Sequence, residues 1–209
     1  METKFYYPNG EAIIKWEDFL DYYNKAYYLY VSESEEKVIE TLLSNKADFS
    51  DKQIYSFLCW KLGFPYSPND EADVTLLHTR TPIAADCLKV IDAIQKEYNY
   101  IDDDNIDEIY SKLKKIDGIG TIYAIAVIYL LSRGRFPIYD RFVRLAMYAI
   151  NEGKAPNATI RLKSLDGGIK IPKEYYNYLD FIKSFGSTSY MERKVDRALW
   201  TYGHLFRQA

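Results

Sequence analysis

Apolar residues recur at helical spacing along most of this chain, and residues that typically begin or end helices separate the periodic stretches. Ser32–Glu35 is a capping box that predicts a helix through about Lys46. Ser50–Gln53 predicts a second helix, which ends at Gly63 and is followed by a loop. Thr81-Pro82 supplies an N-cap and a first-turn proline ahead of a third helix.

The second half of the chain continues this pattern. An acidic run at 102–104 suits the start of a helix over residues 105–115, and the apolar run 122–131 indicates a buried helix. Asp140 precedes the next helix, and residues 151–171 are typical of a loop. Two further helices are expected, from Pro172 to Gly186 and from Ser189 to about Phe206. Because alternating strand patterns are nearly absent, the sequence predicts an all-α protein.

The composition is that of a globular protein. The chain has 209 residues, of which 48% are apolar and 27% charged, so it can bury a sizeable core. This length suits a single domain over 1–209, with two packed lobes as an alternative organisation. No apolar run approaches the roughly 20 residues needed to cross a bilayer, so no membrane partner is expected. Residues 1–4 lack a signal-peptide pattern, which predicts a cytoplasmic location.

Charge is unevenly distributed along the chain. The net charge is −3, but residues 111–209 hold 17 Lys and Arg against 8 Asp and Glu, whereas residues 1–110 hold 10 against 22. An acidic half of about 1–110 and a basic half of about 111–209 indicate an anionic partner for the basic half. The alternative is that the two halves attract each other.

Metal-binding patterns are absent from the sequence. Cys59 and Cys87 are too few for a metal cluster, and both are typical of small core residues. His78 and His204 lie far apart in the sequence, with no carboxylate or cysteine at metal-ligand spacing. We therefore expect each histidine to be a surface or packed residue, and no cofactor to be required.

One turn combines features that suit an anion. Gly118 follows a helix and is suited to the left-handed conformation that ends it, while Gly120 directly precedes the next helix. Ile119 between them is expected to pin the two helices together. The backbone N–H groups of Gly118, Gly120 and Thr121 then favour a phosphate. Lys114 and Lys115 stand beside the turn as countercharges. The alternative is a plain tight turn between two helices.

The wider sequence around this turn resembles a known family. "LKKIDGIGTIYAIAVIYLL…FPIYDRFVRLAM" is similar to the helix-hairpin-helix DNA glycosylases, the superfamily that includes endonuclease III and the adenine and alkylated-base glycosylases. Their hydrophobic-x-Gly-hydrophobic-Gly hairpin matches residues 116–120. Their Gly/Pro-rich loop that ends in an aspartate matches Gly134, Pro137 and Asp140. The resemblance covers about residues 106–148 and implies a multi-helix fold with a central helix-hairpin-helix.

The resemblance implies that Asp140 is the catalytic carboxylate. A carboxylate stabilises the positive character that develops on the sugar when an N-glycosidic bond breaks, and it orients or deprotonates the attacking water. The alternative for Asp140 is an ordinary helix N-cap, and the two roles are compatible. Arg141 and Arg144 are candidates for phosphate contacts, and their alternative is a solvated helix face.

Two departures from the family narrow the expected chemistry. Ile122 stands where strand-cleaving members carry a Schiff-base lysine, so a water-using, monofunctional enzyme is expected. No cysteine follows Cys87, so the iron–sulfur loop of several members is missing. The base-wedging glutamine is not evident, and "LLHTRTP" lies near where it would be sought. The resemblance also implies a monovalent cation, Na⁺ or K⁺, at the backbone carbonyls of Lys114, Ile116 and Ile119.

The expected partner is double-stranded DNA with a damaged base, bound by a nucleoid-associated monomer in base-excision repair. The aromatic segment 16–30, "WEDFLDYYNKAYYLY", most simply packs the core, and the alternative is that one ring stacks on an extruded base. A non-catalytic DNA-binding or damage-recognition protein is the second hypothesis. The third is an interaction protein in which the hairpin is only a turn.

Overall fold

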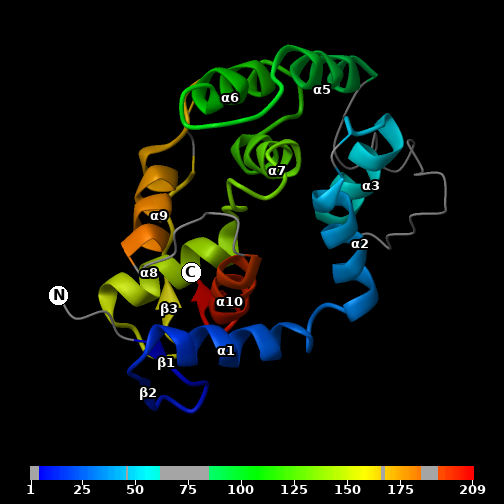
Figure 1. Ribbon diagram of the computed structural model, residues 1–209. Helices are drawn as coiled ribbons and strands as arrows, with labels where there is room; N and C mark the ends of the chain where they lie inside the picture. Colours follow the sequence, from blue (N-terminus) through cyan, green and yellow to red (C-terminus); the bar gives the residue numbers. More distant parts are fainter. Residues whose placement is uncertain (1–4, 46, 62–84, 166–167, 185–192) are drawn as a thin grey trace. The chain divides into compact units, whose positions relative to one another are not determined.

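The computed structural model describes residues 5–45, 47–61, 85–165, 168–184 and 193–209 (Figure 1). Within these ranges the chain is mainly α-helical, as the sequence predicts, and strands are limited to four two-residue segments. The helices are α1 (Trp16–Tyr27), α2 (Glu33–Ser44), α3 (Asp51–Lys61), α5 (Ala85–Glu97), α6 (Ile106–Lys114), α7 (Thr121–Leu131), α8 (Arg141–Glu152), α9 (Lys173–Ser184) and α10 (Arg193–Gly203). The strands are β1 (Phe5–Tyr6), β2 (Ala12–Ile13), β3 (Thr159–Ile160) and β4 (Arg207–Gln208).

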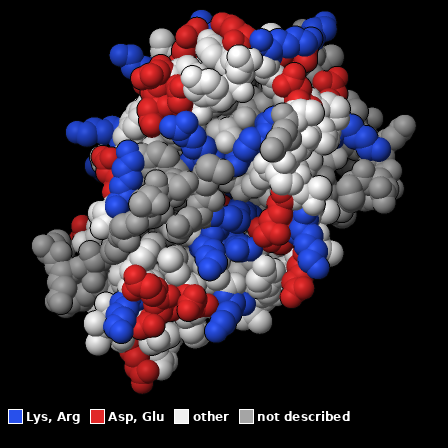
Figure 2. All heavy atoms as spheres, in the orientation of Figure 1, with Lys and Arg blue, Asp and Glu red and all other residues white. Residues whose placement is uncertain are grey.

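The chain forms two compact units, each assembled from separate parts of the sequence. Unit 1 comprises residues 1–32, 137–165 and 174–209, and unit 2 comprises residues 33–136 and 166–173. The boundary therefore does not fall near residue 110. Unit 1 holds 13 Lys and Arg against 11 Asp and Glu, and unit 2 holds 14 against 19. The difference in net charge is thus much smaller between the two units than between the two halves of the sequence. Figure 2 shows basic and acidic side chains interspersed on the face drawn.

Unit 1 is built around α10, which packs against both α1 and α8 (Figure 1). Its core is rich in aromatic residues, and the rings of Phe5, Trp16 and Phe19 lie within 4.7–5.4 Å of one another. The Tyr23 hydroxyl donates to the carbonyl of Tyr6 over 2.6 Å, which joins α1 to β1. The sequence pattern had not predicted α1 as a helix, but its buried rings confirm that the segment packs the core.

The crossing of α8 and α10 in unit 1 is very close. A Cβ atom added to Gly203 would lie 1.9 Å from the carbonyl oxygen of Phe142, so only glycine fits at this point. The strands β3 and β4 pair in parallel and tie the segment after α8 to the C-terminal end of the described chain. These contacts fix the N-terminal end of α8 against the C-terminal end of α10.

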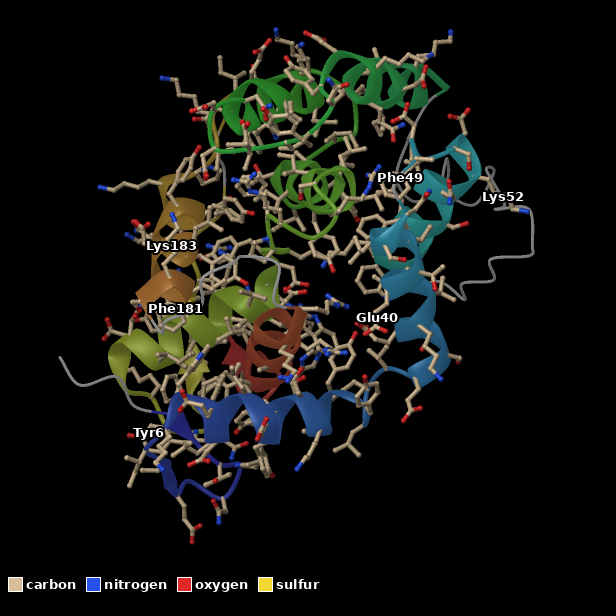
Figure 3. All side chains as sticks on the ribbon, viewed as in Figure 1. Tyr6, Glu40, Phe49, Lys52, Phe181 and Lys183 are labelled. Carbon is tan, nitrogen blue, oxygen red and sulfur yellow. The ribbon has the colours of Figure 1, made fainter. Side chains whose placement is uncertain are left out.

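Unit 2 contains α2, α3, α5, α6 and α7, and α7 is its most buried helix. All but Ile122 and Tyr123 of its residues are buried, which confirms the burial that the apolar run predicts. Arg133, just after α7, donates to the carbonyls of Asn45 and Ala47 and lies 3.9 Å from the ring centre of Phe49, which is labelled in Figure 3. These contacts hold the end of α7 beside the segment that joins α2 to α3.

The start of α3 confirms the helix predicted at Ser50–Gln53, and these two side chains form a capping box. The Gln53 N–H donates to the Ser50 hydroxyl over 3.3 Å, and the Ser50 N–H donates to the Gln53 side chain over 2.9 Å. The predicted features at 63–70, Thr81-Pro82, Gly186 and Ser189 lie outside the described residues. No helix of the described ranges is long and apolar enough to cross a membrane.

Candidate functional site

The turn between α6 and α7 lies in unit 2, and its first glycine has the conformation that the sequence predicts. After α6, the N–H groups of Lys115 and Ile116 donate to the carbonyls of Lys112 and Leu113 over 3.3 and 3.1 Å. Gly118 then adopts φ +82°, in the left-handed region where a side chain is disfavoured. Gly118 thus reverses the chain directly after α6.

Ile119 and Thr121 hold the turn from inside. The Ile119 side chain is 4% exposed, and its N–H donates to the Ile116 carbonyl over 3.2 Å. The Thr121 hydroxyl is buried and lies 3.0 Å from the Tyr110 hydroxyl of α6. Ile119 is therefore buried in the turn, as a residue that pins the two helices has to be. Its buried side chain, and that of Thr121, belong to the turn's framework, which leaves Thr121 only its backbone N–H to offer a ligand.

Gly120 leaves the N-terminus of α7 open. It is the N-cap residue, with φ −77° and ψ 171°, and no side chain caps the helix. An added Cβ would have no atom of the described residues within 4 Å, so a side chain at this position would meet none of them. Uncapped N–H groups and the positive end of the helix dipole attract an anion. The open helix start suits a phosphate oxygen.

The charged residues beside the turn are of both signs. Lys115 is exposed and Lys114 half-buried, and no ion pair joins either of them to another residue of the described ranges. Lys112, in contrast, donates to Glu97 and to the Tyr98 hydroxyl, each over 2.7 Å. Lys114 and Lys115 thus form no ion pair within the described ranges, and the exposed Asp117 adds a negative charge within the turn itself.

Asp140 lies in unit 1 and caps α8. Its Oδ1 accepts hydrogen bonds from the N–H groups of Phe142 and Val143 over 2.9 and 3.3 Å, and the residue is 9% exposed. The predicted N-cap is therefore confirmed. Because one oxygen is bound to the helix start, the carboxylate has a fixed position, as a group that stabilises charge on a substrate requires.

The segment in front of Asp140 is held by tyrosines of α9. The Tyr175 hydroxyl donates to the Pro137 carbonyl over 3.0 Å, and the Tyr139 hydroxyl donates to Glu174 over 2.9 Å. The rings of Tyr139 and Tyr178 stack with their centres 4.9 Å apart. Residues 137–140 are thus fixed by side chains more than thirty positions along the chain.

Burial keeps these phenols protonated. Burial raises the pKa of Tyr175 and Tyr178 well above the ordinary range, and the charge of Asp196 raises both further. The pKa of Tyr139 is also raised, first by burial and then by the Glu174 carboxylate. Tyr175 and Tyr139 therefore remain hydrogen-bond donors at every physiological pH, and the support of Asp140 does not depend on their titration.

The two arginines of α8 differ in their surroundings. Arg144 is buried, and its guanidinium donates to Glu174 over 2.7 Å and to the Lys163 carbonyl over 2.7 Å. The solvated helix face considered for Arg144 is wrong, and its contacts make it part of the framework that holds α8 to α9. Arg141 is exposed and lies over the Phe142 ring, 4.6 Å from its centre. Only Arg141 presents its charge at the surface.

His204 is a residue that the sequence pattern did not connect with Asp140. Its ring stacks on Phe142 with the centres 3.5 Å apart, and Trp200 and Tyr30 complete an aromatic cluster around it. Its Nδ1 lies 2.9 Å from the Trp200 carbonyl. Since a carbonyl only accepts, Nδ1 carries the proton in the neutral ring. Burial lowers the pKa of His204, while the Trp200 carbonyl and the Asp140 charge oppose this shift.

No sequence signal could have found His204, because it lies 64 positions after Asp140 and the close helix crossing at Gly203 brings it there. His78 and the "LLHTRTP" segment lie outside the described residues. Within the described ranges, no group of three or more His, Cys, Asp or Glu side chains could hold a metal ion. No family model, curated protein or solved structure matches this chain.

Proposed function

We propose that this chain is a monofunctional DNA glycosylase that hydrolyses the N-glycosidic bond of an extruded, modified base. The observation that carries the proposal is the fixed carboxylate of Asp140, bound through Oδ1 to the start of α8 and preceded by a segment that α9 holds in place. The helix-hairpin-helix resemblance of residues 106–148 assigns the reaction to this carboxylate.

In the proposed reaction the bond between C1′ and the base nitrogen breaks, and the base leaves with the bonding electron pair. Water then forms the new bond to C1′. Asp140 stabilises the positive charge on the sugar and accepts a proton from the attacking water. Ile122, half-buried on α7, has no amine to attack the sugar, so the product is an abasic site in an uncut strand.

The turn at Gly118–Gly120 supports the DNA-binding part of the proposal. The open N-terminus of α7 would receive a backbone phosphate, with Lys114 and Lys115 as countercharges. The Ile116 carbonyl accepts one hydrogen bond, from Ile119, and keeps a second lone pair. Together with the carbonyls of Lys114 and Ile119 it would bind a Na⁺ or K⁺ ion when DNA is present.

A second candidate function is non-catalytic recognition of DNA. This candidate is favoured by the surroundings of Asp140. Its carboxylate is nine-tenths buried and already accepts hydrogen bonds as the cap of α8. In that case the turn at Gly118–Gly120 binds the backbone while Asp140 serves only the fold. This candidate predicts salt-sensitive DNA binding and no chemistry with any lesion.

The deciding experiment measures base release from duplexes that carry a panel of alkylated, oxidised and mismatched bases. Asp140→Asn is the matched variant, because the asparagine oxygen can still cap α8 while the negative charge is lost. We expect base release to fall by about 100-fold or more, with DNA affinity retained. Absence of release by the wild-type protein, or equal release by the variant, would leave only the binding function.

A further inference from the structure

Unit 2 contains a pocket that is lined neither by the turn at Gly118–Gly120 nor by Asp140. Its volume is about 420 Å³, within the range of about 300–1,000 Å³ that is typical of small-molecule sites. Three parts of the chain line it: the end of α2 with the residues after it, the end of α5 with the residues after it, and the residues around the end of α7. Because all of them belong to unit 2, one compact unit forms the whole pocket.

Hydrogen bonds fix the three walls of this pocket. The Gln95 side chain of α5 accepts from the Phe49 N–H over 2.7 Å and donates to the Phe49 carbonyl over 3.0 Å, which holds the segment after α2 against α5. The Asn105 amide donates to the Tyr100 carbonyl over 3.0 Å and fixes the segment after α5. Arg133 joins the residues after α7 to those after α2. A preformed pocket of this kind binds a ligand without the ordering cost of a flexible loop.

The negative charge that helix C-termini bring to the pocket is balanced by cations of the protein itself. The C-terminal carbonyls of α2, α5 and α7 carry partial negative charge. Arg133 donates to the carbonyl of Asn45, after α2, and to that of Leu131, which ends α7, over 2.7 and 3.3 Å. Lys96 stands in the last turn of α5. Burial lowers the pKa of Arg133, and the nearby Asp48 carboxylate opposes this shift, so Asp48 is a countercharge to Arg133.

Arg135 is the other cation that lines the pocket, and the protein holds it less tightly. Within the described ranges its guanidinium makes one hydrogen bond, from Nη2 to the Asp103 carboxylate over 3.3 Å. This distance exceeds the roughly 2.7–2.9 Å of a strong charge-assisted hydrogen bond, and the Asp103 side chain is 59% exposed. Such an exposed pair contributes little free energy. The planar fork of Arg135 is therefore available to a phosphate or carboxylate of a ligand.

The remaining lining residues suit a flat heterocyclic ring. Ile94, Ile101 and Leu131 give the pocket a buried apolar floor. Tyr100 is 67% exposed, and its ring contacts no other aromatic ring of the described ranges, so a ligand ring can stack on it. Asn99 is exposed, and its amide has no hydrogen bond to a described residue. An amide offers a donor and an acceptor side by side, as the edge of a nucleobase requires.

We propose that this pocket binds a nucleoside monophosphate, with Arg135 on the phosphate, Tyr100 stacked on the base and Asn99 on the edge of the base. A nucleotide combines an anion, a flat ring and an edge of donors and acceptors, whereas a simple aromatic anion offers only the first two. The inference goes beyond the proposed function and does not depend on it, because the pocket shares no residue with the turn at Gly118–Gly120 or with Asp140.

The test measures the binding of AMP, GMP, CMP and UMP to the protein by isothermal titration calorimetry. The four nucleosides, inorganic phosphate and phenyl phosphate serve as comparisons. We expect at least one nucleotide to bind with a Kd of about 10–100 μM, and its nucleoside, inorganic phosphate and phenyl phosphate to bind at least about 10-fold more weakly. The inference is overturned if no nucleotide binds at about 1 mM, or if phenyl phosphate or inorganic phosphate binds as tightly as the best nucleotide.

Two positions assign the contacts to the phosphate and to the base. Arg135→Gln keeps hydrogen-bond donors but loses the charge, so it should weaken the nucleotide by about 10-fold and leave the nucleoside within about twofold. Tyr100→Ala should weaken the nucleotide by about 10-fold, and Tyr100→Trp should retain the affinity. Thermal unfolding checks that each variant is folded. An unchanged nucleotide affinity in a folded Arg135→Gln or Tyr100→Ala overturns the inference.

Control variants change residues of the same type in unit 1. Arg161→Gln and Tyr148→Ala alter exposed side chains that do not line the pocket, and both should leave nucleotide affinity unchanged. Losses equal to those of the pocket variants would mean non-specific attraction and overturn the inference. Asp103→Asn removes the carboxylate that competes for Arg135, so it should strengthen nucleotide binding by about twofold. Weaker binding by Asp103→Asn would contradict the role given to Arg135.

Duplex DNA separates this inference from the proposed function. Arg135→Gln should bind duplex DNA within about twofold of the wild-type protein, because the pocket and the turn at Gly118–Gly120 are different sites. A parallel loss of duplex and nucleotide affinity would make the pocket part of a DNA-binding surface and overturn a separate nucleotide site. If a nucleotide binds but the lesion panel shows no base release, catalysis fails and the nucleotide site stands. If bases are released but no nucleotide binds, only this inference fails.

Discussion

The N-terminal ends of α7 and α8 differ in their capping. Both helices begin after an extended residue, but Gly120 leaves the N-terminus of α7 without a side-chain cap, whereas Asp140 supplies a carboxylate to that of α8. A helix start needs an anion or acceptor in either case. The open start is available to an anion from outside, and the closed start fixes the protein's own anion in place.

The supports of the two starts differ accordingly. The turn before α7 depends on backbone hydrogen bonds, the left-handed Gly118 and the buried Ile119, all within a few positions of one another. The segment before α8 depends on Tyr175 and Glu174 of α9, which are remote in sequence. Contacts between neighbouring residues suffice to orient backbone N–H groups. A functional side chain is fixed in position only when several elements pack around it.

The largest effect is expected from a variant that disrupts the packing of α8 against α10. Gly203→Ala would bring a Cβ within 1.9 Å of the Phe142 carbonyl oxygen, so α8 and α10 have to separate. We expect the free energy of unfolding, measured in urea, to fall by about 3 kcal/mol. Gly120→Ala is the control, because its added Cβ meets nothing and should cost less than about 1 kcal/mol. Equal losses for the two variants would contradict the close crossing.

A smaller effect is expected from the arginines of α8. Arg144→Ala removes the ion pair with Glu174 and leaves that carboxylate partly buried, so we expect a loss of about 2 kcal/mol, below a fully buried pair because the Glu174 side chain is 43% exposed. Arg141→Ala should change stability by less than about 0.5 kcal/mol.

The same two variants, Arg141→Ala and Arg144→Ala, also differ in their expected DNA binding, which is measured by titration at several salt concentrations. Arg141→Ala should lower the salt dependence of DNA affinity by about one unit of slope, and Arg144→Ala should leave the slope unchanged. The reverse assignment of the two slopes would show that Arg144 leaves its ion pair to reach the phosphate backbone.

Gly120→Asp would make the start of α7 resemble that of α8. The backbone of Gly120 is extended and an added Cβ would meet no described atom within 4 Å, so an aspartate can cap the helix and stability should stay equal or rise by about 0.5 kcal/mol. DNA affinity should fall by about 10-fold or more, because the site then carries its own anion. Gly120→Asn, which caps without charge, should lose less affinity, and an unchanged affinity for Gly120→Asp would rule out phosphate binding at this turn.

The smallest expected effect concerns pH. Because burial lowers the pKa of His204 in the folded protein, the unfolded chain binds a proton more readily than the folded one does. Stability is therefore fully present above the ordinary pKa of about 6.5 and is lost as the pH falls below it. Thermal unfolding between about pH 7.5 and 5 should show a slightly steeper decline for the wild-type protein than for His204→Asn. Parallel curves would mean that His204 has an ordinary pKa.

Much of the secondary structure could be predicted because its signals are local. The Ser50–Gln53 capping box, the Asp140 cap and the left-handed Gly118 each depend on residues within a few positions of one another. In contrast, α1 was not predicted as a helix, since its closely spaced tyrosines fit a packed aromatic segment of any type. Its buried residues show helical spacing only once α10 is present to cover them.

The sequence by itself determined most of the helices, the conformation of the turn at Gly118–Gly120 and the cap at Asp140, because backbone geometry and capping are decided by neighbours along the chain. Only the tertiary structure decided which charges remain at the surface and which rings pack against Phe142. Arg141 and Arg144 are indistinguishable in the sequence, yet Glu174 from α9 engages one of them. His204 joins Phe142 because Gly203 lets two helices touch. Such contacts depend on packing between distant segments, which no local pattern encodes.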